Sequence, residues 1–307
     1  MATFNSAGSG NANADATWTE SGQPATGDHC IIASGHTVTL TADELWGSVS
    51  ILGELAGGGY TLTLDDGGDA YIINNDGEIS GTLNVVITGT TNRHIDLAAT
   101  GGANNLTINA SSTTFNLAGG GTHLVGGTLT LTAGALTTGN DCVLTVTGDA
   151  IITSGTTFTG NDSATISFGS LTVEGTYSAT SATTIITSER SNGRAIDIVG
   201  TYTHNSGTLK IQTAADTDLR CPSSSSLNHL IIDHASCIAR PTGDNKPPIA
   251  GDLTINQGKF SLLDSDGSAT HQCTVTGDCV VGDGSGSANT AIFEGRDDSV
   301  TFGSLTI

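Results

Sequence analysis

The stretch GTLTLTAGALTTGNDCVLTVTGDAIITSG, residues 127–155, decides the fold class of this chain. Apolar residues alternate with Thr in GTLTLTAG and again in CVLTVTGD, and each run ends at Gly or Asp. Strict alternation places one set of side chains toward a core and the other toward solvent, as β-strands do. No segment combines helical periodicity with helix caps. The sequence therefore predicts short strands joined by tight turns.

The same strand unit recurs along the chain, and its recurrence predicts how the strands pair. Residues 127–155 align with residues 251–284, so that Cys142 falls on Cys273, and FGSLT follows both copies. Asp-Gly, a frequent hairpin turn, occurs at only four places, too few for an antiparallel meander. Stacked parallel coils are favoured over an antiparallel sandwich, because each coil then buries its apolar face against the next. Further copies of the unit are HTVTLTAD (36–43), YTLTLDDG (60–67), GSLTVEGT (169–176), GTLKIQTA (207–214) and CTVTGDCV (273–280).

Composition supports this architecture. Of 307 residues only 13% are charged and 4% aromatic, whereas Gly occurs 42 times. Such chains form many short strands and turns. We therefore predict an all-β fold, a right-handed parallel β-helix (β-solenoid) with short strands and Gly, Asn and Asp turns, over residues 28–307. Residues 1–27 are expected to form an N-terminal lead and cap, with Trp18 over the first coil, because a terminal coil otherwise exposes an unpaired strand edge.

The last ten residues repeat a phrase from the middle of the chain. DSVTFGSLTI (298–307) matches DSATISFGSLTV (162–173), where a further coil follows. We expect Phe168 and Phe302 to fill the core at equivalent places. The C-terminal end is expected to be uncapped or truncated, so that either a longer polypeptide or another subunit covers it.

The charge balance limits the partners. Nine Lys and Arg against 30 Asp and Glu leave a formal net charge of −21. Nucleic-acid binding is not expected, because phosphate contacts need Lys and Arg. Membrane insertion is not expected either, because no apolar run is long enough to cross a bilayer. The N-terminal sequence shows no signal peptide. An acidic surface is expected to keep a strand-rich protein soluble.

Residues 214–250 are predicted to be a loop-rich elaboration of the solenoid. They contain four of the five prolines and three basic residues, with HLIID (229–233) as an intervening strand. Proline cannot occupy the interior of a hydrogen-bonded ladder, and loops on a rigid scaffold often carry recognition. The alternative is an elongated turn without a special role. The candidate partner-contact residues are Arg220, His229, His234, Arg240 and Lys246.

Two acidic groups are weak candidates for a calcium site, and otherwise no cofactor is expected. Neither fits the twelve-residue calcium loop or the glycine-rich calcium nonapeptide, so solvated turn aspartates are the favoured interpretation. Zinc is disfavoured at His229 and His234, because residues five apart on a strand face opposite sides. The six cysteines are expected to be free and buried. The calcium candidates are Asp65, Asp66, Asp69, Asp76 and Glu78, and also Asp264 and Asp266.

The opening ATWTESGQPATGDHCIIASGHTVTLTAD (16–43) resembles the start of β-helical surface modules such as the domain named for its eight glycines. The units GDLTI, LTVTGD and FGSLTI resemble those of long β-helical proteins in bacteriophage tail fibres and bacterial adhesins. This resemblance implies the fold and a class of function, and it supplies no catalytic residues.

The expected function is a structural, non-enzymatic component of a fibre, spike or appendage of a virion, of the bacteriophage type. The expected partners are other structural subunits, with a homotrimer by analogy, and a host-surface glycan. The expected location is the virion or an extracellular surface. A bacterial extracellular adhesin is the first alternative. A polysaccharide lyase or hydrolase is the second, although the aromatic residues are too scattered for a sugar platform. An ice-binding solenoid is the third, but its Thr-x-Thr steps are irregularly spaced.

Overall fold

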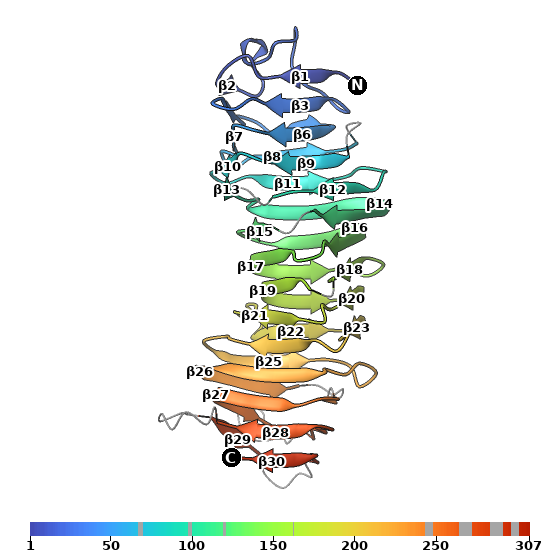
Figure 1. Cartoon of the computed structure of the whole chain (residues 1–307), viewed down its shortest axis with the longest axis vertical. Coiled ribbons are helices and arrows are strands. Elements are labelled where there is room, and N and C mark those ends of the chain that lie inside the picture. The colour runs from blue at the N-terminus through green and yellow to red at the C-terminus, as the bar shows by residue number, and fades with distance from the viewer. Residues whose placement is uncertain are drawn as a thin grey trace. The chain divides into compact units, whose positions relative to one another are not determined.

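The chain folds into parallel strands stacked as a β-solenoid of about 12 turns in total (Figure 1). The computed structural model describes residues 1–66, 70–97, 100–118, 121–161, 163–242, 248–263, 272–282, 291–295 and 301–307. Within these ranges the only helix is a single 3-10 turn, η1 (Asp15–Thr17). The predicted all-β solenoid fold is therefore confirmed.

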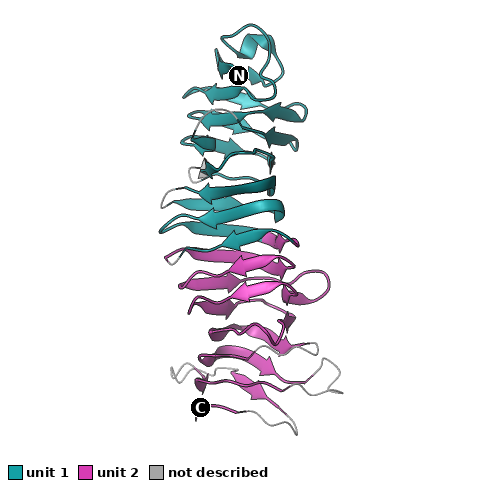
Figure 2. Ribbon diagram, turned by 90° about the vertical axis from the view of Figure 1, so that its right-hand side faces the viewer, with its two compact units in different colours: residues 1–147, 155–161 teal, residues 148–154, 162–307 magenta. Residues whose placement is uncertain are grey.

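The stacked strands form two compact units (Figure 2). Unit 1 comprises residues 1–147 and 155–161, and unit 2 comprises residues 148–154 and 162–307. The strands of unit 1 are β1 (Thr3–Asn5), β2 (Gly10–Asn11), β3 (His29–Ile32), β4 (Thr37–Thr39), β5 (Glu44–Trp46), β6 (Ser48–Ile51), β7 (Glu54–Ala56), β8 (Thr61–Leu64), β9 (Tyr71–Asn75), β10 (Glu78–Ser80), β11 (Asn84–Ile87), β12 (Arg93–Ile95), β13 (Thr100–Gly101), β14 (Asn105–Leu117), β15 (Thr122–Val125), β16 (Leu129–Thr138) and β18 (Thr157–Thr159). β17 (Val143–Ile152) has residues in both units. The strands of unit 2 are β19 (Thr165–Val173), β20 (Thr176–Ser178), β21 (Thr183–Ile186), β22 (Arg194–Ile198), β23 (Thr201–Thr203), β24 (Thr208–Ile211), β25 (Asp216–Arg220), β26 (His229–Pro241), β27 (Leu253–Ser261), β28 (Asp278–Val281), β29 (Ile292–Glu294) and β30 (Ser304–Thr306).

The alternation seen in the sequence becomes vertical columns of side chains. In unit 2, Leu209 of β24 pairs with Leu230 of β26, which pairs with Leu253 of β27. All three are buried, whereas their outward neighbours in each strand are partly exposed. Each inward residue thus contacts the equivalent residue of the coils on either side, which forms a thin aliphatic core.

Aromatic rings extend the core where coils are wide enough to hold them. In unit 2 the ring of Tyr177 lies 6.1 Å from Phe168 and 5.8 Å from Tyr202. Phe168 and Tyr177 are fully buried, so the predicted core position of Phe168 is confirmed. The expected core position of Phe302 is wrong, because its side chain is partly exposed and its ring lies against that of Phe293 at 5.4 Å.

The N-terminal segment closes the core of unit 1. Trp18 is 4% exposed, and its ring lies 6.1 Å from Phe4 and 5.9 Å from Trp46, edge-on to both. Its indole Nε1 donates a hydrogen bond of 2.8 Å to the carbonyl of Ala12. Residues 1–27 also contribute a stacked strand, because β1 pairs in parallel with β3. The segment therefore both begins the stack and covers its apolar end.

Residues 214–250 contain more strand than their prolines suggest. β25 and the long β26 occupy much of this stretch and pair with each other in parallel. Pro222 follows β25, and Pro241 is the last residue of β26. Proline at these positions interrupts no interior ladder hydrogen bond. Among the described residues of this stretch, the expected loop is therefore confined to the connections between strands.

Candidate functional site

Three arginines lie close together on the flank of unit 2, and two of them pair with the carboxylate of Asp197. Nη1 of Arg194 lies 3.1 Å from Oδ2 of Asp197, and Nε of Arg220 donates to the other oxygen of that carboxylate. Arg190 donates from Nη1 to Oγ1 of Thr172 at 2.7 Å. Thr172 is the register neighbour of Asp197. We call this group the arginine cluster; it comprises Arg190, Arg194 and Arg220 with Asp149, Thr172 and Asp197.

A β-bulge at Ala195 builds this cluster. Residues three apart in a regular strand face opposite sides, yet Arg194 and Asp197 meet. The register shifts between Arg194 and Ile196, so Ala195 is the extra residue. Thr217 fixes the bulge, because its hydroxyl accepts the amide of Ala195 at 2.8 Å and donates to the carbonyl of Gly193. Bulges commonly re-aim a side chain in this way.

A tight turn brings the third arginine to the same place. The amide of Arg190 donates to the carbonyl of Arg194 at 3.0 Å, and the amide of Gly193 donates to the carbonyl of Arg190 at 2.8 Å. Gly193 has a φ of 77°, a left-handed conformation that glycine adopts without strain. Nε of Arg190 then lies 3.5 Å from Oδ2 of Asp149.

The acidic and basic groups of the cluster differ in their exposure to solvent. Asp197 is 6% exposed and is paired with two guanidinium groups. The side chains of Arg190, Arg194 and Arg220 are 30%, 32% and 35% exposed. Each guanidinium carries five N–H donors, and the contacts above use few of them. The carboxylate is therefore buried while the cations face solvent.

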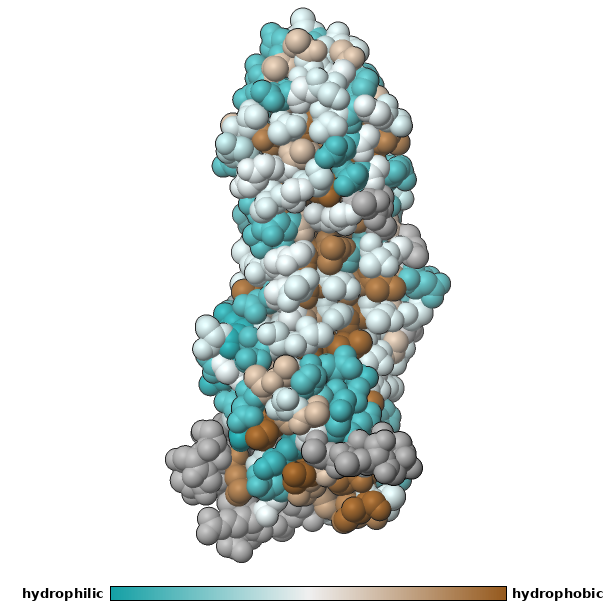
Figure 3. Space-filling model, turned by 90° about the vertical axis from the view of Figure 1, so that its left-hand side faces the viewer, coloured by the Kyte–Doolittle hydropathy of each residue, from teal (hydrophilic) through white to brown (hydrophobic). Residues whose placement is uncertain are grey.

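A small recess adjoins Arg220. It has a volume of about 90 Å³ and is lined by Ile198, Val199, Arg220 and Pro222. Val199 is 59% exposed, the highest value among the large hydrophobic side chains described between the two ends of the chain. Figure 3 shows that the described surface on one face is mostly hydrophilic or neutral, with separate hydrophobic spots. The recess thus combines one cation with apolar walls.

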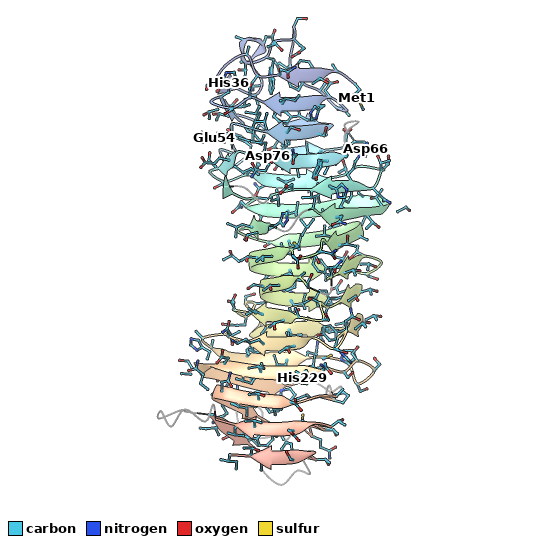
Figure 4. All side chains as sticks on the ribbon, viewed as in Figure 1. Met1, His36, Glu54, Asp66, Asp76 and His229 are labelled. Carbon is cyan, nitrogen blue, oxygen red and sulfur yellow. The ribbon has the colours of Figure 1, made fainter. Side chains whose placement is uncertain are left out.

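The structure separates the predicted partner-contact residues. Only Arg220 belongs to the arginine cluster. Arg240 is 9% exposed and pairs with Asp216 at 3.1 Å, so it serves packing between β25 and β26. His229 (Figure 4) accepts the amide of Asp252 on Nδ1 at 3.1 Å, and His234 accepts the amide of Ser236 at 3.2 Å. Lys246 lies outside the described residues.

Sequence reasoning missed Arg190, Arg194 and Asp197. A signal was present, because SERSNGRAID (188–197) holds two of only nine Lys and Arg residues on either side of an Asn-Gly turn. The approach of Arg220 was not readable, since it depends on the register between β22 and β25.

Two of the described calcium candidates, Asp65 and Asp66, accept hydrogen bonds from residues distant in sequence. Asp66 accepts both the amide and the hydroxyl of Thr90 and of Thr91. Burial raises the pKa of Asp66, but these hydrogen bonds outweigh it and hold the pKa below its ordinary value. Asp65 accepts the amide of Gly27 at 3.0 Å. Asp69, Asp264 and Asp266 lie outside the described residues.

The remaining calcium candidates lie on other corners of the coil. Asp66 follows β8, whereas Asp76 follows β9 and Glu78 lies in β10. Figure 4 shows Asp66 and Glu54 on opposite flanks of unit 1. In the part of the chain that the structure describes, no three His, Cys, Asp or Glu side chains are grouped to hold a metal ion.

Two glutamates line an open groove of unit 1. Glu54 and Glu78 are register neighbours, and the groove of about 310 Å³ also includes His36 and glycines. Hydrogen bonds from Ser80 and Thr37 lower the pKa of Glu54. A glycosidase acid needs a raised pKa, so Glu54 is tuned in the opposite direction.

The outward face of unit 1 includes a column in which different residue types follow one another. One column of register neighbours runs from Tyr71 through His94, Asn116 and Thr137 to Thr159. An ordered lattice of threonines would require the same residue at each level. This mixture gives no support to an ice-binding face.

The cysteines are inert in this fold. All six are buried and free, as predicted. Burial raises the pKa of Cys221 to about 12 and that of Cys142 to about 11. They are therefore thiols at neutral pH and poor nucleophiles.

Comparison with protein-family models, with curated proteins and with solved structures finds no match to this chain. No helix among the described residues has both the length and the apolar character needed to cross a bilayer. The class that the structure defines is therefore a β-solenoid repeat protein.

Proposed function

We propose that this chain is a structural, non-enzymatic β-solenoid within a fibre, spike or appendage of a virion of the bacteriophage type. The observation that carries the proposal is the ladder of side chains that links successive coils in addition to the backbone ladder. Such links make each coil depend on its neighbours. Links of this kind suit a structural protein that must keep its fold under mechanical force.

The ladder of unit 2 arises from the Gly-Asp steps of the repeat. Oδ1 of Asp252 accepts the amide of Asp278 at 2.9 Å, and Oδ1 of Asp278 accepts the hydroxyl of Ser304 at 2.7 Å. The glycines are needed there, because a Cβ on Gly277 would lie 2.3 Å from Oδ1 of Asp252. Gly-Asp in this position thus serves coil stacking.

Unit 1 has an equivalent ladder of asparagines. Oδ1 of Asn84 accepts hydrogen bonds from the side-chain amides of Asn104 and Asn105 at 3.1 and 2.9 Å. Oδ1 of Asn105 in turn accepts the amide of Thr128 at 2.8 Å. Polar residues that an enzyme would present to a substrate are here used to join coils.

A structural role also fits the distribution of ionisable groups. Among the described residues, the carboxylates with lowered pKa are each held by hydroxyl, amide or lysine donors of adjacent segments: Glu20, Glu54, Asp66, Asp233 and Glu294. A homo-oligomer is expected by analogy with fibres, with a host-surface glycan as a further partner. We propose that contacts with either are made on the flank of unit 2, where the arginine cluster lies.

Isolation of the native complex tests this function. The chain should co-purify in stoichiometric amount with a larger particle, and no glycan should be cleaved by the purified chain. Recovery as a free monomer that releases product from a polysaccharide would contradict the proposal.

A further inference from the structure

We infer that the arginine cluster binds an external carboxylate carried on a small, partly apolar frame, as in a hexuronate residue of an acidic saccharide. This inference rests on the proposed function only in that the flank of the solenoid makes contacts. Arg220 is the principal ligand, and the recess beside it receives the frame.

The charge of the cluster leaves room for one anion. Counting ion pairs alone, three guanidinium groups pair with two carboxylates, those of Asp149 and Asp197, so 3 − 2 leaves one guanidinium in excess, while Asp218 lies beside Arg194 in the register. Arg194 directs its guanidinium to Asp197 rather than to Asp218, its register neighbour in β25. This surplus occurs in a chain with a formal net charge of −21. One carboxylate would neutralise it.

The donors of Arg220 have the geometry that a carboxylate requires. Arg220 contacts Asp197 through Nε, and the structure gives its two terminal nitrogens no acceptor among the described residues. Those two nitrogens form the end of a planar fork, which pairs with both oxygens of a carboxylate. Its side chain is 35% exposed, so the fork is accessible.

The size and apolar walls of the recess limit the kind of molecule that can carry the carboxylate. The recess is small, with a volume of about 90 Å³. It therefore accommodates part of a small frame, such as the edge of one sugar ring or a short aliphatic chain. The exposed Val199 and the half-buried Pro222 offer apolar contact for the C–H face of such a frame.

The cluster is preorganised, which reduces the cost of binding. Thr217 pins the bulge, and the buried carboxylate of Asp197 holds Arg194 and Arg220 at fixed positions. Fewer rotatable side chains then need to be ordered when a ligand arrives. A purely structural role would be met by the ion pairs of Asp197 and by that of Arg190 with Asp149, and it would not require the apolar recess beside Arg220.

Titration of the full 307-residue chain with D-glucuronate tests the inference. Glucuronate should shift the backbone amide signals of residues 194–199 and 220, with saturation and a Kd on the order of millimolar. Glucose, which lacks the carboxylate, should cause no shift at the same concentrations. Inorganic phosphate should bind more weakly, because it gains nothing from the apolar walls.

Variants separate the site from general charge. Arg220→Gln should weaken glucuronate binding at least tenfold, and Arg220→Lys should weaken it less, because the charge is kept and the fork is lost. Lys210→Gln is the matched control, since Lys210 is a half-buried cation of unit 2 paired with Asp233 and outside the cluster. Its Kd should stay within twofold of the unmodified chain.

A further variant tests the recess while keeping every ion pair that supports the fold of the cluster. Val199→Asp places a carboxylate on the recess wall without touching an ion pair of the cluster, and it should abolish binding. Absence of a saturable shift in the folded chain would overturn the inference, as would equal affinity for phosphate or binding of an acidic peptide but not glucuronate. Such results would leave the structural function intact, because that function is tested by co-purification.

Discussion

Replacement of Ile232 by alanine tests whether the core is a single column of stacked side chains. Ile232 of β26 pairs with Ile211 of β24 and Ile255 of β27, and all three side chains are fully buried. Ile231, the next residue, faces outward between Lys210 and Thr254. Ile231→Ala is therefore a matched control with the same chemical change in the same strand.

The magnitude follows from the atoms removed. The substitution deletes three methyl or methylene groups, which at ~0.8 kcal/mol each lose ~2.4 kcal/mol of transfer free energy. A cavity term adds to this, and measured values for such changes span about 2–5 kcal/mol. Because the register fixes Ile211 and Ile255 above and below, the site collapses poorly. We expect Ile232→Ala to cost about 3–4 kcal/mol, and Ile231→Ala less than about 1 kcal/mol.

Amide hydrogen exchange of β24, β26 and β27 is the appropriate assay, since it reports local opening in a chain whose coils need not unfold together. Urea unfolding followed by circular dichroism gives an independent comparison of the two variants. Equal destabilisation by the two substitutions, or loss of protection confined to β26, would refute the stacked-column account.

Three further predictions concern other parts of the chain. Trp18→Ala should expose the apolar end of the core of unit 1 and lower the free energy of unfolding by about 3–5 kcal/mol. Unfolding can be followed by the fluorescence of Trp46, the other of the two tryptophans. An unchanged unfolding midpoint would show that Trp18 does not cover the core. Burial lowers the pKa of His123, and Asp96 and the Ala118 carbonyl offset this only in part. The unfolded chain therefore binds the proton more readily, so stability from neutral His123 is complete above the unfolded pKa of about 6.5 and declines as the pH falls below it. His123→Gln, which keeps an acceptor for the amide of Leu97, should lose less stability than the unmodified chain between pH 7.5 and 5, and an identical loss in both proteins would contradict this. Gly200→Ala should lower the free energy of unfolding by about 1–3 kcal/mol, because its Cβ would lie 2.1 Å from the carbonyl oxygen of Gly175. Gly8→Ala is the control and should leave stability unchanged, because its Cβ would meet nothing within 4 Å. Thermal unfolding of both variants tests this difference.

The strand faces were readable from the sequence because their cause is local. Thr61 and Thr63 face outward while Leu62 and Leu64 face inward, as the alternation in YTLTLDDG predicts. Self-similarity between 127–155 and 251–284 similarly identified stacked coils, since similar strands of successive coils bury similar faces. The buried state of the six cysteines followed from the same reasoning.

The site was not readable because its cause is non-local. Arg190 and Arg194 meet through a turn that the sequence shows, but Arg220 joins them only through the register of β22 and β25. That register depends on the bulge at Ala195, which Thr217 stabilises from the neighbouring coil. Alternation alone would have placed Arg194 and Asp197 on opposite faces.

The prolines of residues 214–250 led to a prediction of more loop than the structure has, for a related reason. Pro241 is the last residue of β26, and proline is tolerated at a strand end although it donates no ladder hydrogen bond. Similarly, Asp65 and Asp66 were considered as metal ligands or solvated turn residues. The structure instead shows Asp65 accepting from Gly27 and Asp66 from Thr90 and Thr91, residues that are distant in sequence.

Electron cryo-microscopy of the native particle that contains this chain is the most direct test of a structural function. The account predicts that the chain occurs there as a repeated component, with density for parallel strands spaced about 4.8 Å apart. The flank of unit 2 that carries the arginine cluster should face solvent or a bound partner in that density. A particle without this chain, with the protein found only as a free catalytic monomer, would contradict the account.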